Sequence, residues 1–178
     1  MSLPFKTHSS LKEFLDQKVA EYNTPCFIKN DPVSVPHLFT LKQDIEISAF
    51  LSATISWGNR KSIVANAMRI VSMMGDSPYQ FLMEAKPVEF KPFLDFVHRT
   101  FNGDDCLFFL TSLQNIYRDH LSLEPLFHSM SEHGAAHGIS RFREVFLSTD
   151  HLKRSEKHLA NPYMGSAAKR INILIRII

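Results

Sequence analysis

Residues 40–75 read TLKQDIEISAFLSATISWGNRKSIVANAMRIVSMMG, and two apolar stripes in this stretch decide the fold. Thr40 and Gln43 have capping-box spacing, and the first stripe follows them up to a terminating glycine, Gly58. Asn59 has the side chain of an N-cap, and the second stripe extends from it to Gly75. The stripes consist of Ile45, Ala49, Phe50, Ala53 and Trp57, and of Ile63, Val64, Ala67, Ile70, Val71 and Met74. The stretch predicts a tight helical hairpin.

The sequence on both sides repeats the helical period with short breaks. A capping-box pair, Ser10 and Glu13, introduces a helix expected over residues 10–22, and the proline-rich residues 25–36 are expected to connect it to the hairpin. Further helices are expected after Pro78, from Pro92 to Phe101, from Cys106 to Tyr117, from an opening at 122–125, from Ser140 to Leu147, and from Ser166 onward. Residues 1–178 therefore predict one all-α domain, a compact array of eight or nine short helices.

The composition supports a helical globular domain. Six glycines and nine prolines in 178 residues are too few for an all-β protein with a turn between every pair of strands. Cys26 and Cys106 lie far apart without CxxC spacing, and the first residues lack the apolar core of a secretory signal peptide. The apolar stretches are shorter than the about 20 residues that span a bilayer. These features predict a cytoplasmic protein without a membrane segment.

The net charge of +2 conceals an uneven distribution. Residues 1–140 contain 12 basic and 15 acidic side chains, whereas residues 141–178 contain 8 basic and 3 acidic ones. A basic end of the chain indicates an anionic partner such as nucleic acid, although a solvated basic surface gives the same pattern.

Two expected helix starts carry adjacent cations, where the helix dipole disfavours positive charge. One is Asn59, Arg60 and Lys61, and the other runs from Gly165 and Ser166 to Lys169 and Arg170. Free N–H groups of a first turn, together with basic side chains, can bind the phosphates of a nucleic-acid backbone. The alternative is that these cations are solvated or pair with carboxylates such as Asp44 and Glu156.

Three segments resemble an uncharacterised bacterial family, a domain of unknown function. They are Asp31-Pro32-Val33, the stretch ISWGNRK at 55–61, and the stretch NPYMGSAAKR at 161–170, and the likeness extends over residues 31–178. That family is in turn distantly similar to the helix-hairpin-helix DNA glycosylases, all-helical enzymes that remove damaged bases. The small residue before the lysine-arginine pair is often cysteine in the family and is Ala168 here.

The resemblance implies a DNA-binding protein of the base-excision-repair type with Lys169 as its nucleophile. A lysine amine can attack the sugar C1′ and form a Schiff base. An enzyme of this class extrudes its target base, and aromatic side chains stack on that base; Trp57, Tyr79 and Tyr163 are the candidates. Asn59, Arg60, Lys61, Gly165, Ser166 and Arg170 would then bind the DNA backbone.

The last expected helix favours an alternative function in which the chain is not an enzyme. Its isoleucines and leucine, from Ile171 to Ile178, are apolar almost all round, as in a helix at the centre of a core. We therefore expect either that the natural sequence continues beyond Ile178 or that a second copy of the chain buries this helix. In the alternative, the chain is a non-catalytic interaction module that oligomerises through its C-terminal helix.

Other chemistry has weaker support. The histidines His120, His128, His133, His137, His151 and His158 crowd the C-terminal half, but no H-E-x-x-H spacing or nearby cysteine accompanies them, so we expect no metal. Asp104 and Asp105 are expected to be an N-cap with favourable first-turn charge for the helix that follows them. No phosphate-binding glycine loop or nucleophile elbow is present, and we expect no cofactor.

Overall fold

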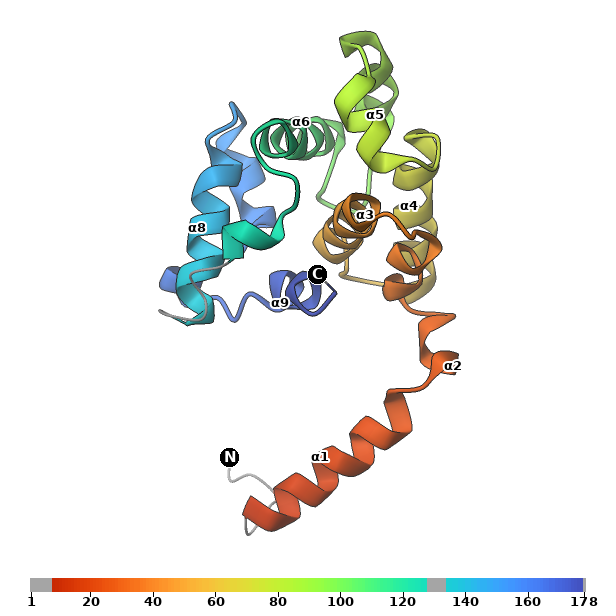
Figure 1. Ribbon diagram of the computed structural model, residues 1–178, viewed down its shortest axis with the longest axis vertical. Coiled ribbons are helices and arrows are strands. Elements are labelled where there is room, and N and C mark those ends of the chain that lie inside the picture. The colour runs from red at the N-terminus through yellow and green to blue at the C-terminus, as the bar shows by residue number, and fades with distance from the viewer. Residues whose placement is uncertain (1–7, 128–133, 178) are drawn as a thin grey trace.

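The computed structural model describes residues 8–127 and 134–177, and it confirms the all-α prediction for them. No strand occurs in these two ranges; an isolated bridge joins His98 and Phe101. The elements are α1 (His8–Tyr22), α2 (Pro25–Ile28), the 3-10 turns η1 (Pro32–Ser34) and η2 (Pro36–Leu38), α3 (Lys42–Thr54), α4 (Arg60–Met73), α5 (Pro78–Glu84), the 3-10 segment η3 (Pro87–Asp95), α6 (Gly103–Asp119), η4 (Glu124–Phe127), α8 (Ala135–Leu147), η5 (Lys153–His158), η6 (Pro162–Met164) and α9 (Lys169–Ile175) (Figure 1).

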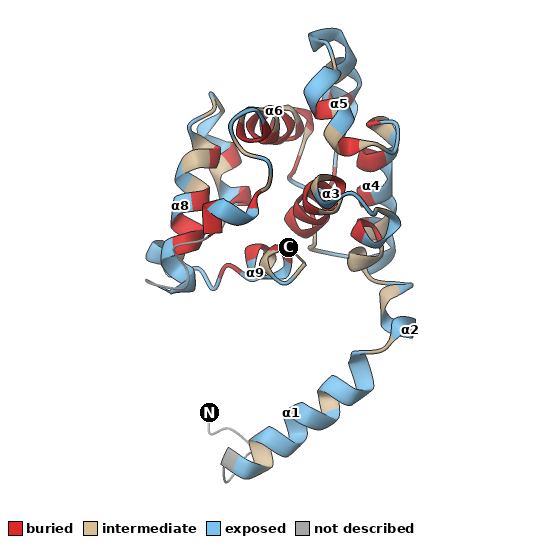
Figure 2. Ribbon diagram, viewed as in Figure 1, coloured by how far each residue is buried: buried red, intermediate tan, exposed pale blue. Residues whose placement is uncertain are grey.

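Helix α3 is the centre of the domain. Ten of its 13 residues are buried, and it packs against α4, α5 and α9 (Figure 2). The predicted hairpin is confirmed, because α3 and α4 pack together across the short connection 55–59.

Aromatic side chains fill the space between α3, α6 and α8. The ring centroid of Phe50 lies 5.6 Å from that of Phe109, 5.4 Å from that of Phe142 and 5.1 Å from that of Phe146. All four side chains are fully buried. Clustered phenylalanines contribute both apolar burial and edge-to-face contacts, so this cluster forms the main hydrophobic core.

One carboxylate is buried in this core with its hydrogen-bonding needs met. Glu46 of α3 accepts hydrogen bonds from the Tyr117 hydroxyl at 2.7 Å, the Ser122 hydroxyl at 2.6 Å and the Leu123 amide at 2.8 Å. Burial raises the pKa of Tyr117, and the adjacent Glu46 charge adds to that rise. Because these donors come from α6 and the segment after it, Glu46 ties them to the central helix.

Several predicted boundaries are wrong. Helix α3 begins after Leu41 without a side-chain cap, since Gln43 instead donates from Nε2 to the Leu121 carbonyl at 3.0 Å. It ends at Thr54, so Trp57 lies outside it. No α-helix begins at Pro92: Pro87–Asp95 form a 3-10 segment, η3, with Pro92 inside it.

The C-terminal half also differs from expectation. Helix α8 begins at Ala135 rather than Ser140, and the 3-10 turns η5 and η6 lie between α8 and α9. Helix α9 buries one face only: Ile171 and Leu174 pack inside, while Ile173 is 43% exposed. The expectation of a helix buried all round is therefore wrong, and α3 of the same chain covers the buried face.

Helix α1 extends away from the rest of the domain (Figure 1). Its apolar residues Leu15, Val19 and Tyr22 share one helical face and are each at least half exposed (Figure 2). Lys12 pairs with Asp16 and Lys18 with Glu21, so its charged residues are matched within the helix. None of the helices in the described ranges is long and apolar enough to cross a membrane.

Candidate functional site

The connection between α3 and α4 places several basic side chains on one part of the surface. Gly58 has φ +112°, a value that L side chains rarely adopt, and an added Cβ would lie 2.9 Å from Nη1 of Arg99. Asn59 is the N-cap of α4, as predicted, because its Oδ1 accepts a hydrogen bond from the Ser62 amide at 3.3 Å. The glycine thus allows Arg99 to lie against the helix start.

Arg60 and Lys61 form the exposed first turn of α4. The Nε atom of Arg60 lies 3.9 Å from Oδ2 of Asp31, and its guanidinium lies 5.6 Å from the ring centre of Phe27. Within the described ranges Lys61 has no hydrogen bond or ion pair. The alternative pairing with Asp44 is wrong, because that carboxylate accepts the Tyr79 amide of α5 at 2.8 Å.

Trp57 lies in the connection between α3 and α4, and other side chains surround its ring. His158 stacks on it with ring centroids 5.7 Å apart, His98 meets it edge-on at 5.3 Å, and the Arg170 guanidinium lies 5.0 Å from its centre. The Asn66 amide donates to Nδ1 of His98, so Nε2 donates to the Trp57 carbonyl at 3.2 Å. Trp57 is therefore half-buried and joins α4, η5 and α9.

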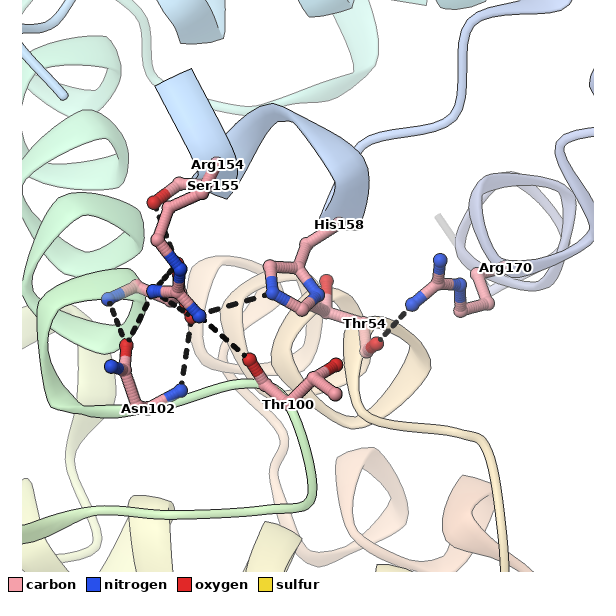
Figure 3. Close-up of polar contacts among 8 residues, drawn as sticks. Thr54, Thr100, Asn102, Arg154, Ser155, His158 and Arg170 are labelled. Carbon is pink, nitrogen blue, oxygen red and sulfur yellow. Dashed lines mark hydrogen bonds and ion pairs between the residues drawn. The ribbon is translucent and has the colours of Figure 1, made fainter. Parts of the chain in front are cut away.

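A buried carboxylate, Asp105, lies beside His158, which stacks on Trp57. Figure 3 shows how Asn102, Arg154, Ser155 and His158 lie around this carboxylate. It accepts hydrogen bonds from Arg154 Nη1 at 3.0 Å, from the Ser155 hydroxyl at 2.6 Å and from the Asn102 amide at 3.0 Å. Asn102 is the N-cap of α6 and Asp105 is its third residue, so the predicted N-cap at Asp104 and Asp105 was placed too late. The capping role itself is confirmed by a reciprocal capping box.

His158 connects the carboxylate to the tryptophan. Its Nε2 lies 3.3 Å from Oδ2 of Asp105, and the side chain is almost fully buried. Burial lowers the pKa of His158, and the Asp105 charge opposes this effect only in part. The histidine is therefore held neutral between a carboxylate and an aromatic ring.

Arg170, the second residue of α9, points inward instead of into solvent (Figure 3). Its Nη1 donates to the Thr54 carbonyl at 2.8 Å, at the C-terminal end of α3. Partial burial lowers the pKa of this guanidinium. The hydrogen bond fixes the start of α9 beside the connection between α3 and α4.

Lys169 is the first residue of α9 and is exposed. The helix begins three residues later than predicted, so Gly165, with φ +80°, and Ser166 lie in the preceding loop. The Ser166 hydroxyl accepts the Ala168 amide at 3.2 Å, and Ala168 itself has φ +48°. This loop and Lys169 line a shallow hollow of about 300 Å³. In the described part of the chain, Lys169 has no hydrogen bond or ion pair.

Glu156, the other carboxylate considered as a partner, binds different cations. It accepts a hydrogen bond from Arg143 at 2.7 Å and pairs with Lys153 at 2.9 Å. These contacts account for the low pKa of Glu156. The alternative in which it neutralises Lys169 and Arg170 is therefore wrong.

The aromatic candidates lie in different places. Tyr163 of η6 is 66% exposed, and its hydroxyl lies 3.4 Å from His137 Nδ1. Tyr79 packs edge-on against Tyr117, near the Asp44 end of α3, which is ten residues from Thr54. Ten residues of helix measure about 15 Å, so Tyr79 is remote from the start of α9.

The histidines form no metal site in residues 8–127 and 134–177, where no three His, Cys, Asp or Glu side chains are arranged to bind an ion. His128 and His133 lie outside the described residues. The sequence had no signal for the arrangement of His98 and His158 around Trp57, because the three segments are far apart along the chain.

Together these features define an all-helical domain in which α9, with the exposed Lys169 at its start, packs against α3, and α4 presents Arg60 and Lys61 in its exposed first turn. The chain belongs to the DUF2400 family, described as proteins of unknown function, which matches residues 31–178. The match contains all three segments that suggested a family and leaves α1 outside. Neither the curated proteins nor the solved structures contain a match to the chain.

Proposed function

We propose that residues 31–178 form a DNA-binding domain of the base-excision type and that Lys169 is its nucleophile. The observation that carries the proposal is the placement of Lys169: exposed, without an ion pair in the described ranges, and beside a surface hollow. Its neighbour Arg170 anchors the helix start through Thr54. A nucleophile needs such a fixed backbone with an accessible amine.

Basic side chains around the start of α4 support the proposal that the domain binds DNA. Arg60, Lys61 and Arg99 are exposed around the start of α4, and none of them is fully neutralised by a close carboxylate within the described ranges. Cations at such positions bind phosphates without reading the base sequence. Tyr163, exposed shortly before Lys169, is the aromatic candidate best placed to stack on a base. Arg170 and Trp57 have mainly positioning roles in this proposal, since they contact each other and α3 or η5.

The proposed chemistry has a defined sequence of bonds. The Lys169 amine attacks C1′ of the sugar, the bond from C1′ to the base breaks, and the base leaves with a proton. The nitrogen lone pair then forms the C=N bond as the C1′–O4′ bond breaks and O4′ takes a proton from water, which gives a protonated Schiff base between Nζ and C1′. A hydride from borohydride reduces that C=N bond to a stable secondary amine and traps the protein on the DNA.

Borohydride trapping on a panel of lesion-containing duplexes tests this proposal. The wild-type chain is expected to give a covalent complex on at least one lesion, and Lys169→Gln is expected to abolish it. Lys157→Gln, another exposed lysine close in sequence, is the matched control and should trap like the wild type. Equal trapping by Lys169→Gln and the wild type, or no trapping on any lesion, would contradict the proposal.

A second candidate function, a protein-interaction module, has one observation in its favour. The face of α1 formed by Leu15, Val19 and Tyr22 is exposed and apolar. Helices of this length rarely persist in water without a packing partner. If this reading is correct, the chain should self-associate in sedimentation equilibrium, and Leu15→Glu with Val19→Glu should make it monomeric. Gln17→Glu is the control on the same helix.

A further inference from the structure

A cleft of about 210 Å³ lies between η1, α3, the start of α4 and α9. Its apolar walls include Pro32, Pro36, Ile63 and Ile173. The side of α3 that faces it presents Ala49, Ser52 and Ala53, which share one helical face, and Ser56 follows shortly after the helix ends. These small residues leave the space open. An apolar cavity of roughly 150 Å³ holds one benzene ring, so this cleft has room for a somewhat larger ring system.

Three polar groups border the cleft. Ser52 is 3% exposed, and its hydroxyl has no hydrogen-bond partner in the described part of the chain. Asp31 uses Oδ1 to accept the Val33 amide at 3.1 Å, which leaves Oδ2 facing Arg60 Nε at 3.9 Å. That separation is longer than a hydrogen bond. The Asp31 carboxylate can therefore accept a hydrogen bond from a ligand, and the Arg60 guanidinium can donate one. A buried hydroxyl without a partner is costly, and a bound ligand would supply one.

We infer that this cleft binds a single nucleobase, with Asp31 accepting an N–H of the base, Arg60 donating to the adjacent acceptor, and Ser52 completing the hydrogen bonds. The inference deepens the proposed function and rests on it for the choice of a base over other ring compounds. Nucleobases combine a flat apolar face with an N–H donor next to an acceptor atom, and both features match this cleft. Its apolar walls would contact the face of the ring.

The position of Lys169 relative to the cleft supports a single site that contains both the nucleophile and the nucleobase. Lys169, Ile173 and Ile177 recur at four-residue spacing along the C-terminal segment, and both isoleucines line the cleft. Four residues of helix rise about 6 Å, so Lys169 lies one turn from the cleft wall at Ile173. Arg170 binds Thr54, which lies between Ser52 and Ser56 of the cleft lining. A base in the cleft would therefore have its sugar on the side of Lys169.

Titration of the chain with hypoxanthine, followed by NMR and calorimetry, tests the inference. We expect a dissociation constant of about 0.1–1 mM, as befits a ligand of this size. Asp31→Asn retains the cap on Val33 but removes the charged acceptor and should weaken binding about tenfold. Ser52→Ala should weaken it about threefold, by the loss of one neutral hydrogen bond.

Two controls distinguish specific binding of a nucleobase from non-specific binding of any apolar ring in the cleft. Ser112 is also buried, with no hydrogen-bond partner among the described residues, but it lies on α6 outside the cleft lining, so Ser112→Ala should bind hypoxanthine like the wild type. Indole has a similar size but lacks an acceptor beside its N–H, and it should bind at least tenfold more weakly. Equal affinity for indole, or equal loss in Ser52→Ala and Ser112→Ala, would overturn the inference.

The two proposals fail separately. Lys169→Gln should retain hypoxanthine binding while it loses borohydride trapping. Trapping by the wild type without any binding of hypoxanthine would refute the nucleobase cleft and leave the nucleophile standing. Binding of hypoxanthine at the cleft without trapping would support the cleft and refute the chemistry of Lys169.

Discussion

Arg170 donates a hydrogen bond from Nη1 to the backbone carbonyl of Thr54 at 2.8 Å, and this contact joins the first turn of α9 to the last turn of α3 (Figure 3). The carbonyls at the end of a helix have no partner within it, so a guanidinium there satisfies one of them. The same guanidinium lies over Trp57. One side chain thus joins the helix that carries Lys169 to the end of α3 and to the connection that leads into α4.

Replacement of Arg170 by alanine should therefore destabilise the fold. The loss of a charged hydrogen bond and of the contact with Trp57 is expected to lower the free energy of unfolding by about 2 kcal/mol. Arg176→Ala, an exposed arginine directly after the same helix, should change it by less than about 0.5 kcal/mol. Urea denaturation measures both values. A similar stability for the two variants would show that Arg170 does not hold α9 in place.

Asp105 should matter more to stability than its neighbour Asp104. Asp105→Asn leaves Arg154 and the Ser155 hydroxyl without their charged partner inside the protein, and we expect a loss of about 3 kcal/mol. Asp104 is exposed, so Asp104→Asn should cost less than about 1 kcal/mol, mainly from the helix dipole. Thermal melting followed by circular dichroism compares the pair. Equal melting temperatures would contradict the role assigned to Asp105.

Stability should fall in acid partly because of His158. Its pKa is lowered in the folded state, so below its ordinary value of 6.5 the unfolded chain takes up a proton that the folded chain excludes. Proton binding then favours unfolding, and the contribution is absent above about pH 7. His158→Gln should show a smaller loss of unfolding free energy between pH 7.5 and 5.5 than the wild type. An unchanged loss would mean that other groups cause it.

Lys61 should contribute to the salt dependence of DNA binding. In a plot of the logarithm of affinity against the logarithm of salt concentration, Lys61→Gln is expected to reduce the slope by about one. Lys86→Gln, which replaces an exposed lysine at the start of η3, should leave the slope unchanged. Fluorescence anisotropy with a short duplex measures both. The same slope in all three proteins would argue against phosphate binding at the start of α4.

The sequence predicted local features of the fold well. Asn59 caps α4 as its side chain and the following stripe indicated, and the hairpin of α3 and α4 is present. Boundaries were less predictable where tertiary contacts compete with local signals. Gln43 has capping-box spacing from Thr40 but binds Leu121, which is 78 residues away, so the local pattern does not form.

The candidate site could be predicted only in part. Arg60, Lys61 and Lys169 stand out because adjacent cations at helix starts are visible in the sequence. The inward orientation of Arg170 was not visible, since its partner is a backbone carbonyl 116 residues earlier. The contacts of Trp57 with His98 and His158 likewise depend on segments that meet only in the folded chain.

The most direct test of the account is to map the covalent bond in a borohydride-trapped complex by peptide mass spectrometry. With a substrate lesion, the reduced sugar adduct is expected on Lys169, and Lys169→Gln is expected to give no adduct at any other lysine above background. An adduct found chiefly on another residue, such as Lys61 or Lys157, would contradict the assignment of Lys169 as the nucleophile.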